Sequence, residues 1–265
     1  MLQVALRPGL QGGRWACLRP LCGHDEAFIN GSGAVNATGF LDRLLLGTPG
    51  TTVGPGKAKN LAVCDCDRLF AAIYLQYFGE RIEGTALCRD CNEPFESSFS
   101  LRDLMASLED GAGARATGPD EEGIYTLPDG RRFRLPTADD QYSIIGLEAE
   151  KAADALLGRC MVEGDPMESP EIIQTAMDEV GAVLDLDLEA ACPKCGALQS
   201  VQFDIQTYLF RALAFEKRFL NREVHRIAMT YGWRHEEILS LTREDRRAFV
   251  RLIEADHVVR RRVRA

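Results

Sequence analysis

The residues best suited to chemistry are four cysteines arranged as two CxxC pairs. Cys88 and Cys91 form the first pair, and Cys192 and Cys195 form the second. Thiolates at this spacing bind soft metals, and two facing pairs supply the four ligands of a closed tetrahedral site. We therefore predict a structural Cys₄ site with Zn²⁺ as its cofactor. Iron stays open as an alternative, because such a donor set accepts both metals.

Two interpretations without a structural metal also stay open. The cysteines can be the buried thiols of two packed hairpins, or one pair can be a redox-active dithiol. A redox CxxC normally lies where a strand turns into a helix, whereas strand-like runs stand on both sides of each pair in this chain. The pattern therefore favours a metal site over redox chemistry.

The segments that carry the cysteines form an internal repeat with an offset of 104 residues. When Cys88 is aligned on Cys192, apolar residues coincide further along: Phe99 with Phe203, Leu101 with Ile205, and Met105 with Leu209. Each copy reads as a strand, a CxxC knuckle, a returning strand and the start of a helix. The predicted fold class is α+β, with a zinc-ribbon-like β core built from the two CxxC hairpins and with flanking and inserted helices.

Three regions are predicted along the chain. Residues 1–60 are rich in glycine and proline and are expected to be a loop-rich N-terminal segment. Residues 61–210 are expected to hold a helix and the zinc-ribbon core, with a hairpin and helices inserted at 106–181. The stretch 109–123 reads as a flexible linker or a loop. Residues 211–265 are expected to form a C-terminal helical module with a basic tail.

This C-terminal module reads as three helices. A long amphipathic helix should end at Tyr231–Gly232, where glycine is a natural C-cap, and a short helix follows. Thr242 and Asp245 have the spacing of a capping box that starts the third helix, with Phe249, Leu252 and Ile253 facing inward. The candidate partner-binding residues of the module are Tyr231, Trp233, Arg243, Arg246 and Arg247.

Charge and hydropathy argue against a nucleic-acid-binding protein and against a membrane protein. The chain carries a net charge of −9, but residues 217–265 hold 13 basic and 7 acidic residues, a local balance of +6 that leaves −15 for the remainder. This balance makes nucleic acid an unlikely general partner. The sequence has neither the run of about 18 apolar residues that a membrane helix needs nor the apolar core of a signal peptide. We expect a protein made in the cytoplasm, with no membrane segment and reduced cysteines.

Two stretches resemble catalytic motifs without completing them. Gly56 and Lys57 fit part of a phosphate-binding loop, but Ala58 stands where the magnesium-binding hydroxyl belongs. His235 and Glu236 begin a zinc-protease motif whose second histidine position is Leu239. Asp65 and Asp67, near a helix start, are expected to complement its dipole. No small-molecule substrate is evident, and we do not expect an enzyme.

The order of several motifs resembles the T4-type baseplate protein family of contractile phage tails and related contractile injection systems. These motifs are LRPLCGHDE at 18–26, LAVCDCDRLF at 61–70, CRDCNEPFE at 88–96, RFRLPTADD at 132–140, CPKC at 192–195 and REVHRIAMTYGWRHEEILSLTREDRR at 222–247. Within the last stretch the matching positions are Tyr231, Trp233, Glu237, Ile238 and Leu241. Thr242 stands where the family usually has proline.

The resemblance implies a structural or assembly component of the baseplate or its hub. Its partners would be baseplate, hub or spike proteins, and it would be incorporated into a phage tail or injection particle. The competing hypothesis is a zinc-ribbon and helix-turn-helix regulator that binds nucleic acid. In that case Arg243, Arg246, Arg247 and the basic tail would contact phosphates. A third hypothesis, an unrecognised enzyme, needs a deep pocket with converging titratable groups.

Overall fold

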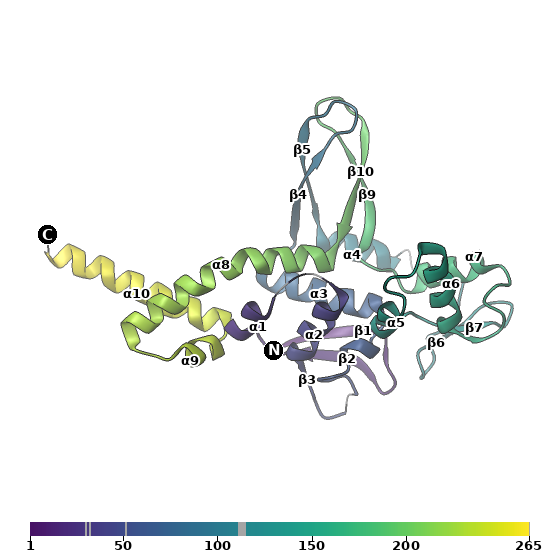
Figure 1. Cartoon of the computed structure of the whole chain (residues 1–265), viewed down its shortest axis with the longest axis horizontal. Coiled ribbons are helices and arrows are strands. Elements are labelled where there is room, and N and C mark those ends of the chain that lie inside the picture. The colour runs from purple at the N-terminus through teal and green to yellow at the C-terminus, as the bar shows by residue number, and fades with distance from the viewer. Residues whose placement is uncertain (30, 32, 51, 111–114, 265) are drawn as a thin grey trace.

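The structure is a computed structural model that describes residues 1–29, 31, 33–50, 52–110 and 115–264 (Figure 1). It mixes helices with antiparallel strands, as the sequence predicts. Among the described residues, no helix combines the length and the apolar character that crossing a membrane requires.

Residues 1–60 are more regular than the predicted loop-rich segment. They contain β1 (Leu2–Leu10), β2 (Gly13–Leu18), α1 (Gly23–Phe28), α2 (Ala34–Leu44), β3 (Leu45–Leu46) and a 3₁₀ turn, η1 (Ala58–Asn60). β1 and β3 pair antiparallel with β2. Gly9 has a φ of +73°, and a Cβ there would lie 2.5 Å from the Gly13 carbonyl oxygen. Glycine in this segment therefore serves a tight hairpin, which is why composition alone pointed to loops.

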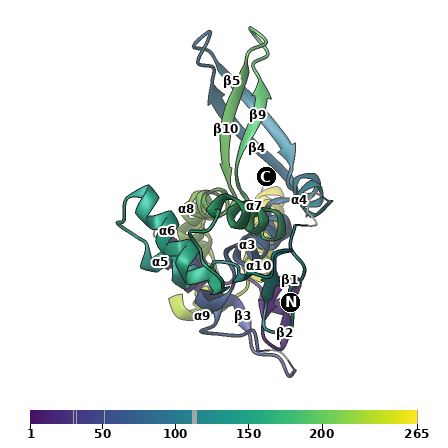
Figure 2. The same ribbon diagram turned by 90° about the vertical axis from the view of Figure 1, so that its right-hand side faces the viewer.

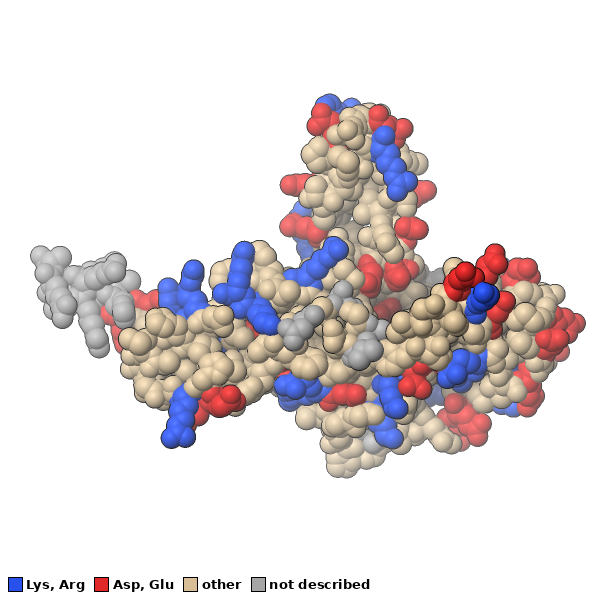
Figure 3. All heavy atoms as spheres, viewed as in Figure 1, with Lys and Arg blue, Asp and Glu red and all other residues tan. Residues whose placement is uncertain are grey.

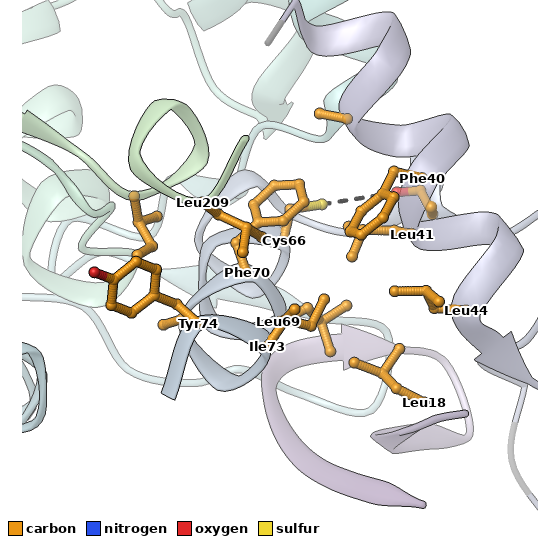
Figure 4. Close-up of a cluster of buried hydrophobic side chains, with 14 of the residues drawn as sticks. Leu18, Phe40, Leu41, Leu44, Cys66, Leu69, Phe70, Ile73, Tyr74 and Leu209 are labelled. Carbon is orange, nitrogen blue, oxygen red and sulfur yellow. Dashed lines mark hydrogen bonds between the residues drawn. The ribbon is translucent and has the colours of Figure 1, made fainter. Parts of the chain in front are cut away.

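The main core lies where three helices from distant parts of the chain meet. α3 (Val63–Phe78) packs against β1 and against α8 (Ile205–Tyr231), and α2 covers another side of it. Figure 4 shows side chains of α2 and α3 pointing toward one another, with Leu209 of α8 nearby. The Phe210 ring of α8 meets Phe40 of α2 and Phe70 of α3 edge to face, with centroids 5.4 and 6.1 Å apart. The N-terminal segment and α8 thus share one core.

The predicted repeat is present in the structure as two helix–hairpin–helix units. The first comprises α3, β4 (Arg81–Leu87), β5 (Pro94–Ser100) and α4 (Leu101–Asp110). The second comprises α7 (Pro170–Val180), β9 (Asp185–Ala191), β10 (Leu198–Asp204) and α8. Arg81 pairs with Ser100, and Asp185 pairs with Asp204, so both hairpins have the same register at the 104-residue offset. The two hairpins stand side by side and project from the body (Figures 1 and 2). We call this projection the tower.

A smaller lobe is inserted between the two repeats. It contains β6 (Ile124–Thr126), β7 (Arg132–Arg134), β8 (Met161–Glu163), α5 (Ala138–Ser143) and α6 (Ala149–Cys160), and α7, the first helix of the second unit, packs against it. The predicted hairpin around Gly130 is β6–β7, and β8 adds a third strand to it. Tyr125, Phe133, Leu157 and Ile173 belong to a second buried cluster. The cluster also includes Ala62 and Cys64 at the start of α3, so the lobe packs around a core that it shares with the body.

The predicted linker at 109–123 is only partly tested. Residues 111–114 lie outside the described residues. Thr117 forms an antiparallel bridge with Thr126, with N–H to carbonyl distances of 2.9 Å in both directions. Residues 115–123 therefore form a loop held to β6, which is one of the two predicted interpretations, and they are not a flexible linker.

The C-terminal module consists of α8, α9 (His235–Ser240) and α10 (Arg243–Arg264), as predicted. α8 ends at Gly232, whose φ is +69°, and Thr242 Oγ1 accepts a hydrogen bond from the Asp245 N–H at 3.1 Å. Ile227, Ile238 and Ile253 form a small core under Trp233 and Phe249. Leu252, expected to face inward, is exposed. In the predicted basic tail, residues 260–265, the side chains and Ala265 lie outside the described part of the structure.

Candidate metal centre

Two identical knuckles carry the cysteines at the tips of the tower. In the first, the Cys88 N–H donates to the Glu93 carbonyl and the Asn92 N–H donates to the Cys88 carbonyl, both at 3.0 Å. In the second, the corresponding bonds join Cys192 to Ala197 at 2.9 Å and Gly196 to Cys192 at 2.8 Å. Asn92 and Gly196 occupy equivalent positions and have φ values of +59° and +77°. Asparagine and glycine are the residues that adopt this left-handed conformation most easily, so both sequences permit the same turn.

The knuckles bring all four sulfurs together. The Sγ atoms of Cys88 and Cys195 are 3.6 Å apart, those of Cys91 and Cys192 are 3.7 Å apart, and all four lie within 4.8 Å of one another. A tetrahedral metal with bonds of about 2.3 Å to sulfur requires sulfur pairs separated by about 3.8 Å. The cluster therefore fits a tetrahedral metal ion, and the predicted ligand set is the one the fold assembles.

The thiols also affect each other's protonation. The N–H groups of Cys195 and Lys194 reach the Cys192 sulfur and lower the pKa of its thiol to about 7. The Glu93 N–H lowers the pKa of Cys91, but desolvation and the neighbouring thiols outweigh it and raise that pKa to about 12. One thiolate thus forms readily, and each further one meets the negative charge already present. A bound cation would remove this repulsion.

Polar contacts across the two knuckles add to the sulfur cluster. The buried side chain of Gln199 accepts a hydrogen bond from the Arg89 N–H at 2.9 Å and donates to Asp90 Oδ2 at 2.7 Å. Lys194 and Glu93 form an ion pair beside it. Sequence reasoning missed Gln199. The signal was available, because the equivalent position in the first copy is the apolar Phe95, and a polar residue in its place points to a hydrogen-bonding role.

The base of the tower is closed by aromatic packing. Phe99 and Phe203, equivalent in the two copies, meet edge to face with centroids 5.0 Å apart, and the Tyr208 ring lies 5.1 Å from that of Phe203. A Cβ placed on Gly84 would lie 2.6 Å from the Tyr208 hydroxyl oxygen. Glycine at this position of β4 therefore makes room for the tyrosine of α8.

The predicted partner-binding residues separate into two groups. Tyr231 is exposed, and Trp233 is half-buried, with its ring 5.3 Å from Tyr231 and 5.0 Å from Phe249. Arg243 and Arg246 are buried, which makes their prediction as surface contacts wrong. Arg247 is half-exposed.

The buried arginines hold the C-terminal module to the body. Arg246 donates to Glu26 of α1 at 2.8 Å and to Glu223 of α8 at 2.6 Å. Arg243 donates to Glu216 of α8 at 2.5 Å, and Arg247 pairs with the same Glu216. Because these guanidinium groups have carboxylate partners inside the molecule, they fasten α10 to α1 and α8.

Asp65 and Asp67 do more than complement a helix dipole. The Asp65 carboxylate accepts hydrogen bonds from the N–H groups of Arg7 and Gly9 at 2.5 and 2.7 Å, and Asp67 accepts one from Leu184 at 2.8 Å. Burial raises the pKa of both carboxyl groups, to about 7 for Asp67, against the lowering effect of these N–H donors. Each aspartate joins α3 to a segment remote in sequence.

The body contains a cavity, and an active site there would require titratable groups that converge on it. It has a volume of about 480 Å³, and its lining includes Cys66, Asp67, Asp185 and Asp204. Asp204 caps α8 by accepting from the N–H groups of Gln206 and Thr207 at 2.9 and 3.2 Å, and Asp67 holds Leu184. Cys66 packs in the core, and burial raises the pKa of its thiol. Two of the three carboxylates in this lining, those of Asp67 and Asp204, thus accept hydrogen bonds from backbone N–H groups.

Comparisons with protein-family models, with curated proteins and with solved structures gave no match for this chain. The baseplate resemblance therefore stays a prediction from the order of the motifs. The metal centre rests on geometry alone.

Proposed function

We propose that the chain is a structural or assembly component of the baseplate or baseplate hub of a contractile phage tail-like particle, with Zn²⁺ in its Cys₄ site. The observation that carries the metal part is the convergence of four sulfurs from two segments 104 residues apart. The baseplate part rests on the order of motifs from Leu18 to Arg247.

The donor set favours a structural ion. All four ligands would come from cysteine, which leaves no position for a substrate or an activated water, and this closed arrangement is typical of structural zinc. The resulting architecture is a zinc ribbon shared between two hairpins. Neither two-stranded hairpin has enough core to be stable alone, so the ion would contribute directly to folding the tower.

The arrangement of charged residues supports an assembly role. Arg243, Arg246 and Asp65 each bind groups of other segments, so these polar contacts hold the molecule together. The tower and the C-terminal module extend from the body in different directions (Figure 1). Such extensions expose side chains to more than one neighbour at once, as a scaffold protein requires.

The proposal is tested by recovering the tagged full-length chain from its native host and identifying the proteins that co-purify. We expect sheath, hub, spike or wedge proteins, and we expect them to be lost with the variant Cys91→Ser/Cys195→Ser. The variant Cys22→Ser, which changes a cysteine outside the cluster, is the matched control. Recovery of nucleic-acid machinery in place of tail proteins would overturn the baseplate assignment.

The second candidate, a nucleic-acid-binding regulator, has one observation in its favour. Arg211, Arg218 and Arg222 of α8 are exposed, and they form no ion pair with any described residue. Burial of Arg243 and Arg246 weighs against the helix-turn-helix form of this hypothesis, because these residues were its phosphate contacts. A salt-dependent shift of duplex DNA by the full chain would favour the regulator.

A further inference from the structure

One face of α8 is unusually rich in uncompensated positive charge. Arg211, Phe215, Arg218, Arg222 and Met229 follow one another at intervals of four, three, four and seven residues, which places them along one face of a helix. All five are exposed, Phe215 to 54% and Met229 to 75%. We call this face the basic stripe. In Figure 3, Lys and Arg side chains gather over α8.

The chemistry of the basic stripe differs from that of an ordinary solvated helix face. The Arg218 guanidinium lies 3.3 Å from the centroid of the Phe215 ring and 4.7 Å from that of Phe219. Stacking holds Arg218 in place with its donors free. Nearby arginines such as Arg226 and Arg246 have carboxylate partners, whereas the three of the stripe have none among the described residues. A pre-organised arginine beside an exposed aromatic ring is typical of a docking surface for an anionic partner.

A surface of complementary chemistry exists on the inserted lobe. The segment 162–172 contains four acidic residues and no basic one. Within it Asp165, Glu168 and Glu171 are exposed and form no ion pair in the part of the chain that the structure describes. Met167 and Ile172 are each exposed to 50%. We call this segment the acidic patch. It offers carboxylates to arginine and apolar side chains to Phe215 and Met229.

The basic stripe and the acidic patch cannot meet within one molecule. α8 runs toward one end of the long axis, and α7, which begins inside the acidic patch, lies at the other end (Figure 1). Figure 3 shows the same separation, with Asp and Glu gathered over the lobe. We propose that the basic stripe of one copy docks on the acidic patch of a second copy. This inference does not rest on the proposed function.

Docking of two different surfaces is heterologous, so each added copy presents a free stripe at one end and a free patch at the other. The assembly grows until it closes into a ring or continues as a filament. Because the contacts pair exposed charges, association should strengthen at low salt and weaken as the Debye length falls.

The test measures the self-association of the metal-loaded full chain by sedimentation velocity over a range of concentrations, at low and at high salt. We expect oligomers at low salt that dissociate at high salt. The stripe variant Arg218→Gln/Arg222→Gln and the patch variant Glu168→Gln/Glu171→Gln should each weaken self-association by about tenfold or more. The control Arg81→Gln/Arg102→Gln removes the same charge from exposed arginines elsewhere and should behave like the unmodified chain.

Mixing the two variants gives the sharpest test. The stripe variant retains an intact patch, and the patch variant retains an intact stripe, so the mixture should form a one-to-one dimer and stop there. A chain that stays monomeric at low salt would overturn the proposal. So would either variant associating as strongly as the unmodified chain, or a mixture that forms no dimer. Binding of duplex DNA to the stripe of a monomeric chain would assign the arginines to nucleic acid instead.

Discussion

Phe99 and Phe203 meet edge to face although 104 residues separate them, and each is the other's equivalent in the internal repeat. The sulfur contacts obey the same relation, because the repeat offset converts the Cys88–Cys195 contact into the Cys192–Cys91 contact. The two units therefore face each other about an approximate twofold axis along the tower. Aromatic rings join them at the base and cysteines join them at the tip.

Removal of the cluster should release the metal and destabilise the tower. In the variant Cys91→Ser/Cys195→Ser we expect loss of about one equivalent of metal per chain and a lower midpoint of thermal unfolding, because two thiolate ligands are missing. Metal content is measured by mass spectrometry of the elements, which also distinguishes zinc from iron. Cys22→Ser should keep the ion. Full metal content in the double variant would contradict the ligand assignment.

Gly84 should be intolerant of a side chain because of Tyr208. Gly84→Ala is expected to lower the free energy of unfolding by about 1–3 kcal/mol, since its Cβ would lie 2.6 Å from the tyrosine hydroxyl oxygen. Tyr208→Phe should rescue much of this loss, because the next nearest atom, Cζ, is 3.9 Å away. Gly158→Ala in α6 meets nothing within 4 Å and should be neutral or stabilising. Denaturant unfolding of Gly84→Ala, Tyr208→Phe, the double variant of these two and Gly158→Ala measures the coupling.

Arg246 should be far more important for stability than its neighbour Arg247. Arg246→Met removes the closer partner of the buried Glu26, leaves only Arg243 Nε at 3.7 Å, and should lower the free energy of unfolding by about 3–5 kcal/mol. Arg247→Met changes a half-exposed pair and should lower it by less than about 1 kcal/mol. Adding Glu26→Gln to Arg246→Met should recover part of the loss. Equal effects of the two arginine substitutions would contradict the assigned burial.

The Asp67 carboxyl should make stability depend on pH. Burial raises its pKa from 3.8 to about 7, so the folded chain binds this proton more tightly than the unfolded chain. Its contribution to stability is therefore most favourable at low pH and declines as the pH rises from about 4 to about 7. Asp67→Asn removes this titration, so the variant should gain stability relative to the unmodified chain across that window, by up to roughly 4 kcal/mol.

Urea unfolding at pH 5 and pH 8 checks this prediction, with the exposed Asp187→Asn as the control for charge removal. The sign is the informative part, because most carboxylates are stabilising when ionised. A stability difference between Asp67→Asn and the unmodified chain that does not change with pH would contradict a buried titrating group at this position.

The features predicted correctly from the sequence are those that depend on the spacing of residues close together in the chain. The CxxC pairs, the repeat offset, Gly232 as a helix end and the Thr242–Asp245 capping box each depend on residues a few positions apart. Such signals survive folding because the backbone geometry of a turn or a helix end is set by the residues within it. The repeat added a long-range constraint, since two like hairpins with facing ligands have one simple way to combine.

The features predicted wrongly depend on partners far away in the chain. Arg243 and Arg246 were predicted to lie on a basic surface. Glu26 lies 220 residues before Arg246, and no residue near Arg246 in the sequence indicates that the two pair. The predicted role of Asp65 at a helix start was incomplete for the same reason, since its hydrogen-bond donors are N–H groups of β1. Residues 1–60 contain more regular structure than their composition indicated, because glycine there supports a hairpin. In each case a tertiary contact decided between two locally acceptable roles.

The 104-residue separation of the two cysteine pairs also sets the time that passes between their synthesis on the ribosome. At about 5–20 residues per second, roughly 5–20 s pass between the appearance of the first pair and that of the second. During this interval the first knuckle has two of the four ligands, and the inserted lobe can fold against the start of α3 in the meantime. Ribosomes that follow on the same messenger carry the same half-finished site. During this period the first hairpin of a new chain can pair either with the second hairpin of the same chain, once it is made, or with the second hairpin of a neighbouring chain.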